Sequence, residues 1–301
     1  MDLHPISRRR ALAAALGAGL AGLARPRGAL GDAREPARPP HRYRVAACDW
    51  MLLKRQKLGA FALAKACGLD GVEVDLGGLG TRPDFDNKLL DPAVRKQFLD
   101  ASQETGVAIC SLAMSAFYGQ SFADHPNADH FVDEWAGTMR AMGVRVGFLP
   151  FGVKGNVRDD PAARARFVAV LKRAAPRIEA AGVVLGIETN LDAEGQLRFL
   201  DAVGSPAVQV YYNLGDALEN GYDPGKEIRR LGKDRLCQVH CKEGSVRLGE
   251  GAIDFEGVVR AIRQTGYDGW LTVELYPNVD DPDGAARAAR DVIRPLLGPA
   301  G

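Results

Sequence analysis

The sequence predicts a single α/β domain that forms a closed (β/α)8 barrel, and three observations lead to this fold. From residue 43 onwards, short apolar runs alternate with segments of helical pattern as far as the end of the chain. Eight such pairs follow one another, and eight parallel strands are the number that closes a TIM barrel. An open doubly wound sheet is the alternative, but no GxGxxG turn follows the first strand.

The predicted elements follow in order along residues 43–301. The predicted strands cover residues 44–48, 71–75, 107–114, 144–150, 183–189, 208–213, 236–242 and 270–275. The predicted helices cover about 57–67, 91–105, 128–142, 160–181, 193–203, 224–231, 254–265 and 284–297. Asp91-Pro92 and Asp160-Pro161 are typical helix starts, and glycines such as Gly106 and Gly182 follow several predicted helix ends.

An export signal and a linker are predicted to precede the barrel. Residues 1–33 place Arg8 and Arg9 before a weakly apolar stretch at 11–24, which resembles a twin-arginine signal, and the Pro-rich segment 34–42 follows. The apolar stretch is shorter than the about 20 residues that a spanning helix needs, so we expect no stable membrane insertion. We expect a folded protein exported to the periplasm; a disordered or uncleaved tail is the alternative.

Composition and charge narrow the class of partner. Of the 301 residues, 46% are hydrophobic and 26% charged, which is typical of a soluble globular protein with a sizeable core. The net charge is +1, but the first 42 residues hold eight arginines and three acidic residues, so the remaining chain is slightly acidic. This balance disfavours a nucleic-acid partner and favours a small neutral substrate.

The five cysteines are predicted to be packing thiols rather than disulfides. Their number is odd, and Cys237 and Cys241 lie on one predicted strand, where about 3.3 Å per residue separates them by roughly 13 Å. A CxxxC metal pair is the alternative for these two residues.

Polar residues end four successive predicted strands, where the chemistry of such barrels takes place. These residues are Glu188, Asn213, His240 and Glu274. Side chains alternate between the two faces of a strand, and the position of each residue in this alternation allows all four side chains to point into one mouth of the barrel. A mixed set of oxygen and nitrogen donors suits one divalent ion such as Mn²⁺, Co²⁺, Mg²⁺ or Zn²⁺. Structural hydrogen bonding is the alternative for each residue taken singly.

Other residues near strand ends are candidates for binding substrate. Glu73 is expected either to hydrogen-bond substrate or to form a salt bridge, and Lys242 either to bind hydroxyls or to lie solvated at the rim. The aromatic loop 115–127, which includes Tyr118, is expected either to close over a sugar or to pack the rim. Trp50, just after the first predicted strand, is also a substrate-binding candidate.

The motifs GIETN, VYYNLGDA, VHCKEG, LGEGAIDF and GYDGWLTVE resemble those of the sugar phosphate isomerase/epimerase family of xylose isomerase-like barrels, over about residues 43–298. The resemblance implies one divalent metal held by Glu188, residue 213, His240 and Glu274, with the two glutamates also acting as the acid/base pair. It further implies that Arg247 contacts substrate. The usual Asp-x-Gly-Asn pattern is here Asn213-Leu214-Gly215-Asp216.

The function expected from the sequence is therefore a divalent-metal-dependent isomerase or epimerase of a sugar or keto-sugar. Glu188 and Glu274 would transfer a proton through an enediolate. A lyase or dehydratase acting on a keto-sugar or polyol is one alternative, and a non-catalytic metal-binding or sugar-binding barrel is another. The five histidines in the sequence are too few for the three-metal cluster of the superfamily's DNA-repair branch. Assembly into a homo-oligomer is left open.

The twin-arginine interpretation predicts that replacing Arg8 and Arg9 by lysine blocks export, because this route depends on the arginine pair. Immunoblotting of periplasmic and cytoplasmic fractions measures the effect, and Arg25→Lys with Arg27→Lys is the matched control. Unchanged export of the folded double variant at positions 8 and 9 would contradict the interpretation.

Overall fold

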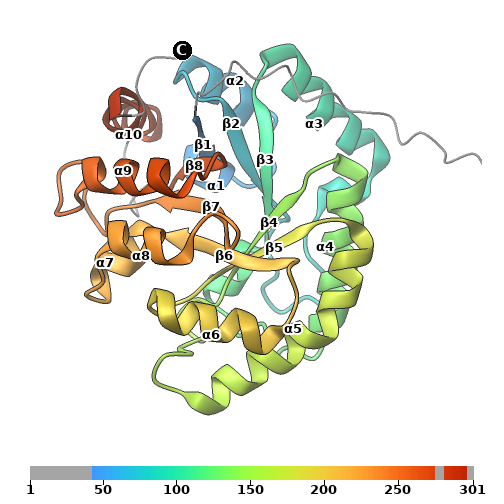
Figure 1. The fold of residues 1–301 in the computed structure, drawn as a ribbon. Helices are drawn as coiled ribbons and strands as arrows, with labels where there is room; N and C mark the ends of the chain where they lie inside the picture. Colours follow the sequence, from blue (N-terminus) through green and yellow to red (C-terminus); the bar gives the residue numbers. More distant parts are fainter. Residues whose placement is uncertain (1–42, 275–280, 297–301) are drawn as a thin grey trace, which may run out of the picture. The chain divides into compact units, whose positions relative to one another are not determined.

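The structure is a computed structural model that describes residues 43–274 and 281–296. Its strands form one closed parallel barrel in chain order, which confirms the predicted fold (Figure 1). The strands are β1 (Arg44–Cys48), β2 (Gly71–Asp75), β3 (Ala108–Ala113), β4 (Val146–Pro150), β5 (Val184–Glu188), β6 (Val208–Asn213), β7 (Leu236–Cys241) and β8 (Trp270–Val273).

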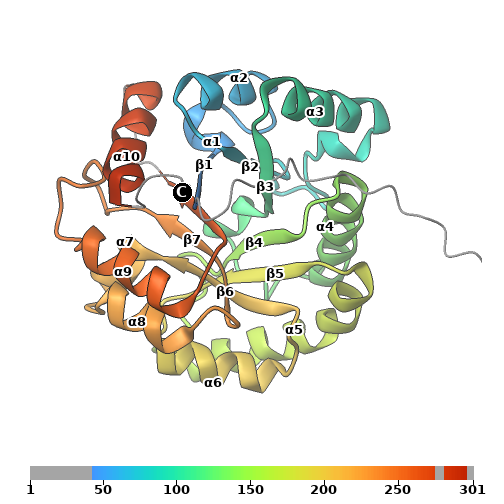
Figure 2. The same ribbon diagram turned by 45° about the horizontal axis from the view of Figure 1, so that its top comes forward.

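The long helices surround the strands, as the turned view shows most clearly (Figure 2). They are α2 (Gly59–Ala66), α3 (Pro92–Thr105), α4 (Ala128–Met142), α5 (Pro161–Ala181), α6 (Ala193–Val203), α8 (Pro224–Leu231), α9 (Phe255–Thr265) and α10 (Pro282–Leu296). The main core lies between these helices and the barrel. No helix within the described residues has both the length and the apolar character needed to cross a bilayer.

Local capping explains where several helices begin and end. The Asp91 and Asp160 side chains accept hydrogen bonds from backbone N–H groups in the first turns of α3 and α5. Gly106 and Gly182 follow these helices in the left-handed conformation, at φ 72° and 70°. Such a backbone costs glycine little because it has no Cβ atom. These helix signals were therefore predicted correctly.

Four short helices were not predicted: α1 (Asp49–Leu52), η1 (Lys88–Leu90), η2 (Ser115–Tyr118) and α7 (Leu214–Glu219). They are too short to show a periodic apolar pattern. Most other boundaries differ from the prediction by one or two residues. The leader and linker at 1–42, and the predicted strand end at residue 275, lie outside the described residues.

All five cysteines are free, as predicted, and Cys237 alone among them is half-buried rather than buried. In the loop that follows β3, Phe117 and Phe122 are fully buried and pack edge to face, with ring centroids 5.1 Å apart. These two aromatic side chains therefore pack the rim.

The strand register brings the candidate residues to one level. Asn213 on β6 lies opposite His240 on β7, and Cys48 on β1 lies opposite Glu73 on β2. The ends of parallel strands meet at one edge of a barrel, so these side chains share one mouth.

The capping of α5 predicts that Asp160→Ala lowers the free energy of unfolding by about 1 kcal/mol, because two backbone N–H groups lose their acceptor. Urea unfolding followed by circular dichroism measures the change. Asp160→Asn keeps an acceptor oxygen and should retain most of the stability. An equal loss in both variants would contradict the capping explanation.

Candidate active site

Three of the four predicted ligands form one buried cluster at the mouth of the barrel. Glu188 ends β5, His240 lies on β7, and Glu274 follows β8, with exposures of 5%, 0% and 4%. His240 Nδ1 lies 3.1 Å from Glu188 Oε2 and 3.8 Å from Glu274 Oε2. One donor atom from each of these residues lies within 4.8 Å of the others, which is close enough for the three side chains to share an ion.

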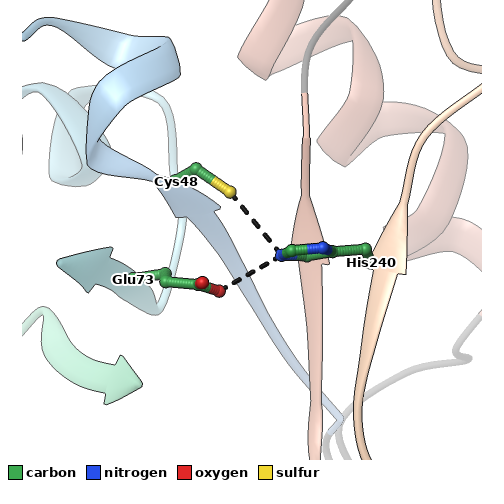
Figure 3. A group of neighbouring side chains, drawn as sticks. All are labelled: Cys48, Glu73 and His240. Carbon is green, nitrogen blue, oxygen red and sulfur yellow. Dashed lines mark hydrogen bonds and ion pairs between the residues drawn. The ribbon is translucent and has the colours of Figure 1, made fainter. Parts of the chain in front are cut away.

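The opposite edge of the His240 ring is held by residues from β1 and β2. Figure 3 shows Glu73 and Cys48 both pointing at His240 Nε2, with Glu73 Oε2 at 3.2 Å and Cys48 Sγ at 3.8 Å. Glu73 is fully buried and also accepts a hydrogen bond from the Tyr211 hydroxyl. A carboxylate behind a histidine fixes the ring orientation and keeps the proton on Nε2. Nδ1 is then the nitrogen available to a ligand.

Electrostatics favour a positive charge in this cluster. Burial alone would lower the pKa of His240, but Glu73, Glu188 and Glu274 outweigh it and raise that pKa to about 10. The structure thus surrounds one imidazole with carboxylates from both sides. A divalent ion would meet the same negative charge, and its binding at Nδ1 would displace a proton.

Glu274 is the carboxylate most closely tied to the rim. Its Oε1 accepts a hydrogen bond of 3.0 Å from the Tyr118 hydroxyl and lies 3.8 Å from Lys242 Nζ. Burial raises the pKa of Glu274, although His240 and Lys242 act in the opposite direction. Both Tyr118 and Lys242, predicted as substrate-binding residues, therefore contact a candidate catalytic side chain.

Asn213 lies where the sequence predicts, but its amide is oriented differently from a metal ligand. Its Oδ1 accepts hydrogen bonds from the backbone N–H groups of Gly215 at 3.0 Å and Asp216 at 3.2 Å, and so caps α7. Its Nδ2 donates to Glu188 Oε2 at 2.9 Å and to Glu274 Oε2 at 3.1 Å. The capping bonds fix this orientation, and an amide N–H is a donor rather than a ligand. This arrangement does not favour direct ligation by Asn213.

The remaining substrate-binding candidates lie around the cluster. Arg247 is exposed and lines a small pocket together with Glu274. Trp50 is half-buried and packs, with Tyr118, against an aromatic cluster that includes Phe148. Glu73 lies behind His240 and forms the ion pair that was one of its two predicted roles.

Sequence reasoning missed a second network at the ends of β1 and β2. Asp49 accepts hydrogen bonds from the backbone N–H groups of Gln56 and Asp75, at 2.8 and 3.3 Å. Asp75 is fully buried and pairs with Arg55 at 2.9 Å. Burial raises the pKa of Asp75 to about 6. Asp49 directly follows the first predicted strand and Asp75 ends the second, and these positions were the sequence signal that could have indicated the network.

Comparison with known proteins finds relatives over most of the chain. The chain is 27% identical over 202 residues to a 2-epi-5-epi-valiolone 7-phosphate 2-epimerase of an Actinoplanes species, covering 67% of this chain and 73% of that protein. It is 25% identical over 262 residues to the L-ribulose-5-phosphate 3-epimerase UlaE of Escherichia coli K12, covering 79% and 89%.

A solved structure shares the fold. The D-allulose 3-epimerase from a Methylomonas species, crystallised with D-allulose, superposes with a TM-score of 0.65 at 21% identity, covering 85% of this chain and 98% of that one. The family model described as xylose isomerase-like TIM barrel matches residues 61–296. With its closed barrel and the acidic cluster around His240, the chain belongs to the xylose isomerase-like TIM barrel family.

Proposed function

We propose that this protein is a divalent-metal-dependent isomerase or epimerase of a keto-sugar. The observation that carries the proposal is the placement of two buried carboxylates, Glu188 and Glu274, within hydrogen-bonding distance of the same Asn213 amide nitrogen. Two such groups at one mouth provide a proton acceptor and a proton donor for a single substrate. The names of two curated relatives, epimerases of L-ribulose 5-phosphate and of 2-epi-5-epi-valiolone 7-phosphate, support the same reaction class.

The side chains fit one divalent ion through Glu188, His240 Nδ1 and Glu274. Two carboxylates and an imidazole suit Mn²⁺, Co²⁺, Mg²⁺ or Zn²⁺. When bound, the ion would polarise the substrate carbonyl and acidify the neighbouring C–H group. Glu73 supports this arrangement because it holds His240 from the opposite ring edge.

The two glutamates then account for the proton transfers. One carboxylate removes the proton from the carbon next to the carbonyl, which leaves an enediolate, and the other carboxyl group returns a proton. Return to the neighbouring carbon gives isomerisation, and return to the opposite face of the same carbon gives epimerisation. The pKa of Glu274 is raised towards neutral pH, and a carboxyl group whose pKa is closer to the working pH exchanges protons more readily. Tyr118 and Lys242 position this carboxylate from the rim.

The test is solvent deuterium incorporation into a panel of ketoses and 3-keto-sugars, with and without phosphate, in the presence of each of the four ions. Exchange at the carbon next to the carbonyl is expected with at least one ion. Loss of water from the substrate instead would indicate the lyase. Ion binding without exchange in any substrate would indicate a non-catalytic barrel.

The proposed roles of Glu274 and His240 predict different defects. Glu274→Gln should lower turnover by at least about 100-fold, because an amide does not exchange the proton, while weakening ion binding only in part. His240→Ala should weaken ion binding more strongly, because it removes the nitrogen ligand. Deuterium exchange and calorimetric titration measure the two effects. Equal ion binding by wild type and His240→Ala would contradict the site.

Asn213→Asp is predicted to raise ion affinity by one to two orders of magnitude, on the order of 1.4–2.8 kcal/mol. An aspartate can keep one oxygen on the backbone N–H groups of Gly215 and Asp216 and turn a second, charged oxygen towards Glu188 and Glu274. Without an ion, the added carboxylate should also destabilise the fold, because the Asn213 donor is lost. Calorimetric titration and urea unfolding of the apo protein measure both effects. Unchanged affinity would exclude residue 213 from the ion's surroundings.

A further inference from the structure

A separate cavity of about 470 Å³ lies beside the carboxyl ends of β1 and β2. Its wall comes from two stretches, residues 50–57 after β1 and residues 77–88 after β2. None of the candidate ligands Glu188, His240 and Glu274 lines it. The proposed proton transfer therefore leaves this cavity without a role.

The wall of the cavity is strongly cationic. Lys54, Lys57 and Lys88 line it together with Arg55, and Asp86 is the acidic residue among its lining residues. Arg55 is already neutralised, since its Nε lies 2.9 Å from a buried Asp75 oxygen. Across residues 43–274 and 281–296, none of the three lysines forms an ion pair. Three ammonium groups around one cavity create a positive potential that attracts an anion.

A buried amide donor without a partner lies in the same wall. Gln56 is 5% exposed and adopts a left-handed backbone with φ 55°, which is rare for a residue with a side chain. Its backbone N–H donates to Asp49 Oδ2 at 2.8 Å, and its Oε1 accepts from the Lys88 backbone N–H at 2.8 Å. Its Nε2, in contrast, has no hydrogen-bond partner within the part of the chain that the structure describes.

An unpartnered buried donor destabilises the fold, and a strained backbone adds to that cost. The nearby Gly77 leaves the amide uncovered, since a Cβ atom there would lie 3.1 Å from Gln56 Nε2. Such a donor among cations is suited to an oxyanion, whose oxygen would accept the missing hydrogen bond.

We propose that this cavity binds the phosphate group of a phosphorylated keto-sugar. The phosphate oxygens would accept from Gln56 Nε2 and pair with Lys54, Lys57 and Lys88. Trp50 connects the two regions, because it lines the cavity and packs on the aromatic cluster that also contacts Tyr118. Tyr118 in turn donates to Glu274. This proposal rests on the proposed function and adds its substrate class.

The first experiment measures phosphate binding without any turnover. Inorganic phosphate is titrated calorimetrically at constant ionic strength into wild type, into Lys54→Ala with Lys57→Ala, and into the control Lys65→Ala with Lys172→Ala. The control removes the same charge from exposed positions on α2 and α5. We expect the Lys54 and Lys57 double variant to bind at least 10-fold more weakly and the control to match wild type. No binding to wild type, or equal loss in both double variants, would overturn the phosphate site.

A second variant tests the buried donor. Gln56→Glu keeps an oxygen to accept from the Lys88 N–H but places a negative charge where Nε2 lies. It should abolish phosphate binding while its far-ultraviolet circular dichroism stays that of wild type. Retained binding in a folded Gln56→Glu protein would contradict the proposed contact.

The kinetic experiment separates this proposal from the proposed function. Deuterium exchange is compared for a ketopentose and its 5-phosphate. In the Lys54 and Lys57 double variant, we expect KM to rise at least 10-fold for the phosphate ester and to stay unchanged for the free sugar. Equal KM changes for both substrates would overturn the substrate assignment. A third outcome is that only the Lys54 and Lys57 double variant loses phosphate binding, while the wild type shows no deuterium exchange in any ketose. This outcome would support the anion site and refute the isomerase.

Discussion

The contact of His240 with carboxylates at both edges of its ring is the interaction on which the site depends. Glu73 lies 3.2 Å from Nε2, and Glu188 lies 3.1 Å from Nδ1. All three side chains are buried, and carboxylates without a compensating charge or hydrogen bond are costly in such surroundings. The imidazole, the Asn213 amide and the Tyr211 hydroxyl provide that compensation. Their removal would leave buried negative charge without compensation.

Closure of the barrel makes this arrangement possible. β1 and β2 supply the residues behind His240, whereas β5 and β8 supply those in front of it. Only a closed ring of parallel strands brings the ends of the first and last strands to one place. Asn213 joins the two glutamates through one amide, and its oxygen simultaneously begins α7. Helix capping and site geometry are therefore coupled in one side chain.

The mouth combines two environments of opposite charge. Around His240 the carboxylates dominate, and the proposed divalent ion would be complementary to them. Around Gln56 the lysines dominate, and the proposed phosphate group would be complementary to them. A keto-sugar phosphate would complement both environments. Its carbonyl and hydroxyl oxygens would face the ion, and its phosphate group would face the lysines. Trp50 lies between these environments as an apolar surface.

The sequence alone determined the eight strand and helix units, because apolar periodicity and capping residues such as Asp160 are local signals. It also placed Glu188, His240 and Glu274 together, since side-chain alternation and strand ends are regular. Only the tertiary structure decided which atoms face the site. The orientation of the Asn213 amide follows from its hydrogen bonds with backbone N–H groups. The position of Glu73 follows from its contact with the His240 ring on β7. The unpartnered Gln56 nitrogen lies in a strained turn. These contacts depend on rotamers and on residues distant in the chain, and packing alone selects them.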